Sequence, residues 1–91
     1  MFAPVYTRQF ERDLKRLRRG GHDLNLLKEV LAKLIAGERL PPKFKEHRLR
    51  GAWKGRSECH IRPDWLLIYK IDRKQNLICF ERTGSHVDLF G

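Results

Sequence analysis

The sequence has no apolar run that approaches the roughly 20 residues needed to cross a bilayer. Its first residues do not follow the pattern of a secretory signal peptide, in which an apolar core comes after a basic start. No stretch rich in glycine, serine or proline divides the chain as a linker would. We therefore expect one cytoplasmic domain over residues 1–91, with no membrane partner.

Cysteine is scarce, because the chain has only Cys59 and Cys79, each within an apolar, strand-like segment. In a cytoplasmic protein such residues are usually reduced and buried rather than joined in a disulfide. A zinc site formed by Cys59, His60 and His86 is the sharper alternative. Neighbouring residues on a strand point to opposite faces, however, so Cys59 and His60 are poorly placed to bind one metal. We expect no metal and no cofactor.

Acidic residues are also few: 11 Asp and Glu stand against 20 Lys and Arg, which gives a net charge of +9. Such an excess favours a polyanionic partner, most simply nucleic acid. Solubility alone would be served by charges of both signs in closer balance. Charge does not distinguish DNA, RNA, the ribosome or an acidic protein. The hydrophobic content of 41% suffices for a modest core, so we expect the chain to fold.

The N-terminal half predicts a short strand and two amphipathic helices. Residues 2–6 are strand-like, and Pro4 places that strand at a sheet edge. Thr7 caps the first helix, which ends at Gly20, and Asp23 caps the second. Two helices joined by so short a turn should pack as a hairpin. Apolar residues recur at helical spacing in both, at Phe10, Leu14 and Leu17 and at Leu27, Val30, Leu31, Leu34 and Ile35.

The C-terminal half predicts three strands, at residues 57–62, 65–71 and 77–82. A tight Pro63-Asp64 turn connects the first two, and a looser turn over residues 72–76 connects the last two. The expected fold class is therefore α/β in the broad sense, or α+β. It is a small, largely antiparallel sheet with the N-terminal helical hairpin packed on one face.

If both turns are regular, His60, Leu67 and Arg82 form one row across the sheet. Adjacent strands lie about 4.8 Å apart, so His60 and Arg82 would be roughly 10 Å apart and would flank one phosphodiester. A slip of one residue in either turn would break this row. The opposite face, under the helices, would carry Cys59, Ile61, Leu66, Ile68 and Cys79.

Residues 39–56 have the composition of a loop. Basic residues in its second half, Lys54 among them, are interleaved with His47 and Trp53. This mixture suits a single-stranded nucleic acid, through backbone charge and base stacking. The alternative is a solvated loop whose Trp53 packs at the core edge, and for Trp53 alone we favour packing.

Three histidines, His47, His60 and His86, lie close to basic and aromatic residues in the sequence. A ribonuclease that uses no metal must deprotonate the 2′-hydroxyl, stabilise the charged phosphorane and protonate the leaving 5′-oxygen. Histidine suits proton transfer because its reference pKa of about 6.5 lies near neutrality. Any one of the three is more often a surface or structural residue, but their grouping favours chemistry. His22 lies apart from them and is expected to be structural.

Other candidates have competing interpretations. Arg62 and Arg82 are candidate phosphate contacts, although Arg82 would also serve as a solvated edge charge. Asp64 lies in a Pro-Asp turn and is more often a turn former than a base. Trp65 and Phe90 either stack on bases or pack.

Three segments resemble the YafQ branch of the RelE-type toxins: HRLRGAWKG at 47–55, CHIRPDWLLIYK at 59–70 and FERTGSHVDLFG at 80–91. The resemblance implies a RelE-like fold and a toxin of a type II toxin–antitoxin pair that cuts mRNA in the ribosomal A site without metal. It implies His86 with Asp64 or His47 as the acid–base candidates, and Arg82 on the phosphate. Functional positions of the family also match His60, Trp65 and Phe90 in this sequence.

The implied partners are mRNA, the ribosome and a cognate antitoxin. A toxin of charge +9 predicts an antitoxin segment that is acidic and partly disordered when free. Two rival functions share the charge, namely a non-catalytic poison of a protein target, like the gyrase-inhibiting relatives, and an inert RNA-binding protein. A protein-binding poison has no need of three imidazoles, and an RNA-binding protein should tolerate loss of His86.

Overall fold

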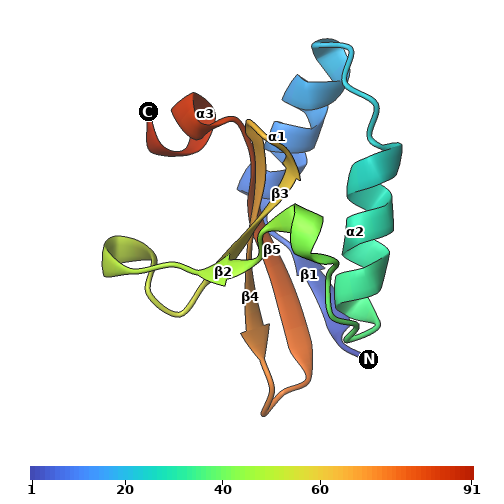
Figure 1. Ribbon diagram of the computed structural model, residues 1–91, viewed down its shortest axis with the longest axis vertical. Coiled ribbons are helices and arrows are strands. Elements are labelled where there is room, and N and C mark those ends of the chain that lie inside the picture. Colours follow the sequence, from blue (N-terminus) through green and yellow to red (C-terminus); the bar gives the residue numbers. More distant parts are fainter.

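The computed structural model describes residues 1–91 as a five-stranded sheet with three α-helices (Figure 1). No helix has the length and apolar character needed to span a bilayer. The expected α+β class is confirmed, with a mixed sheet. The strands are β1 (Ala3–Tyr6), β2 (His47–Arg48), β3 (Ser57–Arg62), β4 (Trp65–Asp72) and β5 (Leu77–Gly84). The helices are α1 (Arg8–Arg19), α2 (Asn25–Ile35) and α3 (His86–Phe90), with 3₁₀ turns η1 (Pro42–Phe44) and η2 (Gly51–Trp53).

The strand order is β1-β5-β4-β3-β2. β1 runs parallel to β5, with Ala3 opposite Leu77, and the other neighbouring strands are antiparallel. β1 therefore lies at a sheet edge, as Pro4 predicted. The first and the last strands in the sequence lie side by side.

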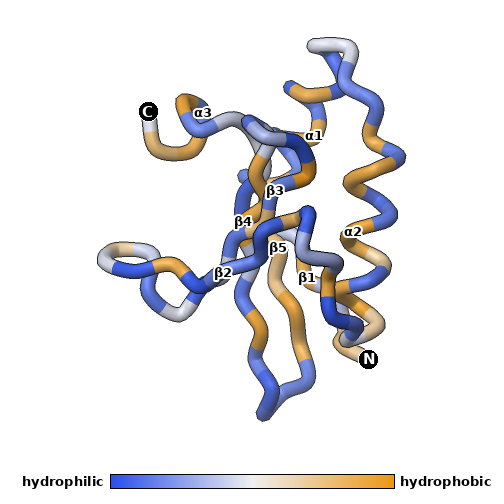
Figure 2. The backbone as a smooth tube through the Cα atoms, viewed as in Figure 1, coloured by the Kyte–Doolittle hydropathy of each residue, from blue (hydrophilic) through white to orange (hydrophobic).

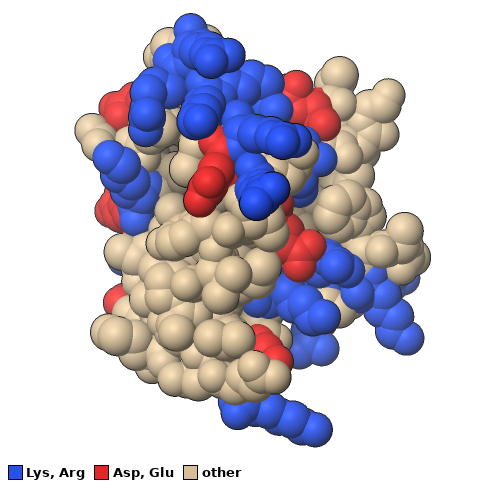
Figure 3. Space-filling model, turned by 180° about the vertical axis from the view of Figure 1, so that it is seen from behind, with Lys and Arg blue, Asp and Glu red and all other residues tan.

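The first helix forms as predicted, because the Thr7 side chain accepts a hydrogen bond from the Phe10 N–H at 2.9 Å. One face of α1 buries Phe10 and Leu17. Its outward faces carry many of the cations, and Figure 3 shows Lys and Arg side chains gathered over the upper part of the molecule where α1 lies.

The start of the second helix differs from the prediction. α2 begins after Leu24, and Asp23 lies one residue earlier, where its carboxylate accepts the Asn25 N–H at 2.9 Å. Both helices cover the same face of the sheet, α1 against β5 and α2 against β3 (Figure 1). Their buried apolar residues, Leu17 of α1 and Leu27 of α2 among them, join one core with the strands beneath.

The sheet has apolar residues on both faces, and Figure 2 shows orange segments along its central strands. The larger core lies under α1 and α2 and includes Phe10, Val30 and Tyr69. A smaller cluster on the other face joins Leu66, Ile68 and Leu89. The second face is therefore covered by α3 and by the η2 segment.

Both predicted turns form, but the predicted row of His60, Leu67 and Arg82 does not. Arg62 pairs with Trp65 and Asp72 pairs with Leu77, as regular turns require. Register shifts then occur within the strands, one between His60 and Arg62 and one between Phe80 and Arg82. Each leaves one extra residue on one strand, as a β-bulge does. His60 consequently lies opposite Leu66, and Leu67 lies between Cys59 and Thr83.

The same shifts correct the predicted helix-facing residues. Cys59 and Ile61 do lie in the core under the helices, but Leu66 and Ile68 belong to the cluster on the other face. Trp65, Leu67 and Tyr69 point toward the helices instead. Cys79 alternates with the core residues Ile78 and Phe80 and is only partly buried. Both cysteines are free, and burial raises the pKa of the Cys59 thiol to about 12.

Two short elements were not predicted. β2 lies within the segment interpreted as a loop, and α3 follows β5. Ser85 and Asp88 form a capping box, in which each side chain bonds the backbone N–H of the other. The Ser-x-x-Asp spacing is the signal that would have identified α3.

Candidate active site

His47, His60 and His86 form a row that crosses three elements. His47 lies on β2, His60 on β3 and His86 at the start of α3. The ring centroid of His60 lies 6.2 Å from that of His47 and 6.0 Å from that of His86. The structure therefore brings the three histidines together, with His60 in the middle.

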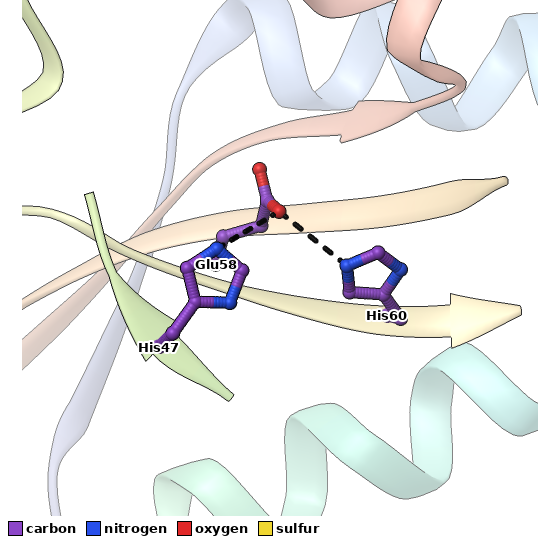
Figure 4. A group of neighbouring side chains, drawn as sticks. All are labelled: His47, Glu58 and His60. Carbon is purple, nitrogen blue, oxygen red and sulfur yellow. Dashed lines mark ion pairs between the residues drawn. The ribbon is translucent and has the colours of Figure 1, made fainter. Parts of the chain in front are cut away.

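Glu58 joins two members of this row (Figure 4). Its Oε1 lies 3.4 Å from Nε2 of His47 and 3.5 Å from Nε2 of His60. Glu58 is opposite His47 in the strand register and two residues before His60, so the three side chains leave the same face of the sheet. Sequence reasoning missed Glu58, although its two-residue spacing from His60 was a signal.

Backbone carbonyls orient both imidazoles toward Glu58. Nδ1 of His47 is 2.9 Å from the Lys45 oxygen, and Nδ1 of His60 is 3.3 Å from the Pro63 oxygen. A carbonyl only accepts, so each Nδ1 donates, and each Nε2 of a neutral ring presents a lone pair. Two Nε2 atoms and one carboxylate oxygen thus converge. This cluster is suited to taking up a proton or a cation.

Asp64 and His86 form the second carboxylate–imidazole pair. Nδ1 of His86 lies 2.6 Å from Oδ1 of Asp64, which also accepts the backbone N–H of His86 at 3.1 Å. These hydrogen bonds from His86 hold the pKa of Asp64 below its ordinary value. The His86 side chain is 54% exposed. Its second nitrogen, Nε2, is therefore accessible to a substrate.

Arg82, a predicted phosphate contact, is bound by Asp13 of α1. Arg82 Nε donates to Asp13 at 2.8 Å and Nη2 donates at 3.2 Å. Asp13 is fully buried and also accepts bonds from the Thr83 N–H and from Arg16. Burial acts to raise the pKa of Asp13, but the bonds from Arg82, Thr83 and Arg16 together lower it. Nη1 of Arg82 has no hydrogen-bond partner, and the side chain is 21% exposed.

The remaining predicted residues are dispersed. Trp65 is buried under the helices, where its Nε1 donates to the Thr83 hydroxyl at 2.9 Å, so it packs rather than offering a surface for a base. The His22 ring meets the Trp65 ring edge-on, which is consistent with a structural role for His22. Phe90 is half exposed and meets Trp53 edge-on, with ring centroids 5.7 Å apart. Lys54 and Arg62, the other two residues predicted to bind the substrate, are exposed.

Two basic hollows adjoin the histidine row. The larger, of about 790 Å³, includes His47 and is lined by cations from β2, from the residues on both sides of η2 and from the β4–β5 turn. The smaller, of about 270 Å³, includes His60 and lies at the end of β3. Positive charge therefore continues from the row in two directions, which suits a polyanion longer than one phosphate.

His47, Glu58 and His60 also fit a transition-metal ion. One ligand atom from each lies within 4.8 Å of the others. Imidazole nitrogens suit zinc and copper, and metal-binding histidines commonly donate their other N–H to a carbonyl, as both do here. The zinc alternative considered from the sequence combined His60 with Cys59 and His86, whereas the strand geometry places His47 and Glu58 beside it.

A family model and a curated relative both relate this chain to the same group of toxins. A family described as the bacterial toxin of a type II toxin-antitoxin system, YafQ, matches residues 2–91. The mRNA interferase toxin YafQ of Escherichia coli (strain K12) is 44% identical over 87 residues, which cover 94% of this chain and 92% of that protein.

Solved structures agree over the whole length. The YafQ chain of the E. coli DinJ-YafQ complex is 40% identical, covers 100% of both chains and has a TM-score of 0.92. A metal-bound toxin from Helicobacter pylori is 41% identical, covers 99% of this chain and 100% of its own, and has a TM-score of 0.93.

Proposed function

Because the chain belongs to the YafQ family of type II toxins, we propose that it is an mRNA interferase, an endoribonuclease that cleaves mRNA by acid–base chemistry. The observation that carries the proposal is the row of three histidines with two carboxylates bonded to it. In the proposed reaction, the 2′-hydroxyl of one nucleotide attacks the adjacent phosphorus, and the 5′-oxygen of the next nucleotide leaves.

His86 is the proposed general acid. The Asp64 carboxylate accepts its Nδ1–H and so stabilises the imidazolium. The exposed Nε2–H then protonates the leaving 5′-oxygen. Asp64 acts through His86 and fixes the direction in which its ring points.

The cluster of His47, Glu58 and His60 is the proposed base. Its three converging acceptor atoms take up the proton of the attacking 2′-hydroxyl. Within this cluster, His60 lies between His47 and His86, with its ring centroid 6.2 Å from that of His47 and 6.0 Å from that of His86. We place the scissile phosphate against His60, so that base and acid act on opposite sides of phosphorus.

Cations and one aromatic pair are proposed to hold the RNA. Nη1 of Arg82 and the side chain of Lys54 supply positive charge for the phosphates, and such charge stabilises a phosphorane. The half-exposed Phe90, supported by Trp53, offers a ring on which a base stacks. Trp65 has no part in this scheme because it is buried.

A second proposed property is inhibition by metal. A transition-metal ion would fit His47, Glu58 and His60 and would supply a Lewis acid there. The toxin from H. pylori is metal-bound. The two Nε2 atoms would no longer be available as proton acceptors. Cleavage should therefore persist in a chelator and fall when Zn²⁺ or Cu²⁺ is added. Loss of activity in the chelator would contradict a metal-independent reaction.

The proposed partners are the ribosome and an antitoxin. The E. coli relative forms a complex with DinJ. By analogy, this chain with its charge of +9 should bind an acidic antitoxin segment that is partly disordered when free. Its association rate should fall steeply as salt rises, and a rate independent of salt would argue for recognition by apolar contacts alone.

The direct test of the function is His86→Ala, with Lys74→Ala, an exposed lysine that lines neither hollow, as the matched control. Loss of one acid–base group should lower the cleavage rate on ribosome-bound mRNA by about 10²–10⁴. Circular dichroism and the melting temperature should not change, because His86 is exposed. Wild-type growth arrest by folded His86→Ala protein would instead favour a non-catalytic poison.

A further inference from the structure

The smaller hollow beside His60 has a place in the fold that suits a flanking nucleotide. β2 pairs only with Ser57 and Glu58, so the end of β3 at residues 60–62 is an open sheet edge. η1 lies along that edge, and α2 closes one side with Leu26. The result is a cavity of about 270 Å³ that shares His60 with the histidine row.

The cavity combines an apolar floor with a cationic rim. Buried Phe44 and Ile61 line it together with Leu26. Lys43, Lys45 and Arg62 also line it, and none of these cations forms an ion pair. No carboxylate is present in its wall. An occupant should therefore have a flat apolar part and a negative charge, which are the two parts of a nucleotide.

The volume limits the occupant to something small. Sites for drug-sized ligands measure about 300–1,000 Å³, and this cavity falls just below that range. It accommodates a single nucleotide rather than a length of strand. A Lys43 Nζ already lies 5.2 Å from the centre of the Phe44 ring, so charge and aromatic surface are adjacent.

The same backbone builds the cavity and orients the histidines. Lys45 adopts a left-handed conformation with φ of 48°, which is uncommon for a residue other than glycine. Its carbonyl accepts from Nδ1 of His47 while its side chain lines the cavity. Pro63 likewise lines the cavity and accepts from His60. Strained backbone of this kind is concentrated at binding sites.

We propose that this cavity binds the nucleotide next to the scissile phosphodiester, with its base on the apolar floor and its phosphate at Lys45 and Arg62. The proposal rests on the proposed cleavage of mRNA, since His60 is the wall shared with the reacting groups. Residues outside the histidine row would then select the base next to the cleaved bond.

A binding measurement that involves no cleavage tests the site. Adenosine, guanosine, cytidine and uridine 5′-monophosphates, ribose 5-phosphate and inorganic phosphate are titrated into the protein, and amide shifts are followed by NMR. We expect at least one nucleotide to shift the amides of residues 43–45 and 60–62 and to bind about tenfold more tightly than ribose 5-phosphate, as base stacking allows. Equal binding of all six probes would reduce the site to an anion contact and overturn the proposal.

Variants separate the floor from the rim. Leu26→Trp fills the cavity and should remove the preference for nucleotides over ribose 5-phosphate. Arg62→Ala changes only an exposed side chain and should weaken nucleotides and ribose 5-phosphate alike, by about tenfold. Lys74→Ala should change neither. If Leu26→Trp fails to fold, Lys43→Ala with Arg62→Ala still tests the rim.

A kinetic measurement connects the site to the reaction. On ribosome-bound mRNA, Arg62→Ala and Leu26→Trp should raise KM about tenfold with kcat within about twofold of wild type, and should alter the preference for the base beside the cut. Loss of nucleotide binding without any change in cleavage would overturn the subsite but leave the nuclease standing. If the variants weaken only antitoxin binding, the cavity belongs to the protein interface and the proposal fails.

Discussion

At the residue scale, the two carboxylates of the site occupy opposite environments. The Glu58 side chain is 7% exposed and lies between two imidazoles, whereas the Asp64 side chain is 68% exposed and bonds only His86. The sequence pointed to Asp64 through its turn and through the resemblance, whereas only the two-residue spacing from His60 marked Glu58. Glu58 meets His47 only because β2 pairs with β3, and the two-residue strand β2 was not predicted from the sequence.

Glu58→Gln should lower kcat by about 10²–10⁴ while leaving the melting temperature nearly unchanged. The amide keeps the size of the side chain but replaces a carboxylate oxygen that faces both Nε2 atoms. Single-turnover cleavage of ribosome-bound mRNA measures the effect, with the exposed Glu38→Gln as control. Full activity of Glu58→Gln would remove the carboxylate from the proposed base.

Asp13→Asn should destabilise the fold by roughly 3–5 kcal/mol, because it leaves Arg82 and Arg16 without their buried partner. Since the folded-state pKa of Asp13 is lowered, its contribution is present above the ordinary value of 3.8 and is lost as the pH falls through the folded-state pKa. Wild-type melting temperature should therefore drop in acid, and the variant should lose less over the same interval. Parallel acid profiles would exclude this role.

The same contact changes the expectation for Arg82. From the sequence, Arg82→Ala is predicted to abolish activity with the fold intact, since a substitution at a strand end removes little packing. The structure shows its guanidinium bound to a fully buried carboxylate, so the variant should also lose stability. Phosphate contact must therefore be tested with Arg82→Lys, which keeps the charge but loses the paired geometry.

At the element scale, the sequence predicted regular features and missed local irregularities. Helical spacing, turn residues and the Thr7 cap gave β1, α1, α2 and both hairpin turns close to their observed positions. The bulges near Ile61 and Glu81 were not predicted because neither position has a glycine or proline to mark it. One extra residue in each strand was enough to move Leu66, Ile68 and the predicted row to other positions.

The cap of α3 controls the position of His86. Ser85→Ala should cost about 1 kcal/mol of local helix stability. In a five-residue helix, that loss should fray the first turn and lower kcat, with little change in global melting. Faster amide exchange confined to residues 86–90 would accompany it. Thr7→Ala, the same change at the cap of α1, is the matched control and should lower global stability with kcat retained.

At the scale of the whole molecule, positive charge extends far beyond the site. Exposed cations gather where α1 lies (Figure 3), and no residue of α1 lines either hollow beside the histidines. A few nucleotides of mRNA cannot contact so wide an area, whereas ribosomal RNA can. We therefore expect binding to the ribosome to be largely electrostatic and independent of sequence.

Cleavage of one mRNA should be fast on programmed ribosomes and weak or absent when the mRNA is free, at matched enzyme and salt. Reversing charge at Arg12, Lys15 and Arg19 together should weaken ribosome binding and flatten its dependence on salt, since fewer counterions are released. These positions exclude Arg16, which is bonded to Asp13. Equal rates on free and ribosome-bound mRNA would defeat the idea.

The pairing of β1 with β5 has a consequence during synthesis. Ala3 leaves the exit tunnel early, but its partner Leu77 is added 74 positions later (77 − 3). A sheet closed by so distant a contact forms late and slowly. Residues 77–90 carry that strand, Arg82 and His86, so a nascent chain that still holds them inside the tunnel cannot assemble the cleavage site. We therefore expect the nascent chain to be unable to cleave mRNA on the ribosome that makes it until residues 77–90 emerge.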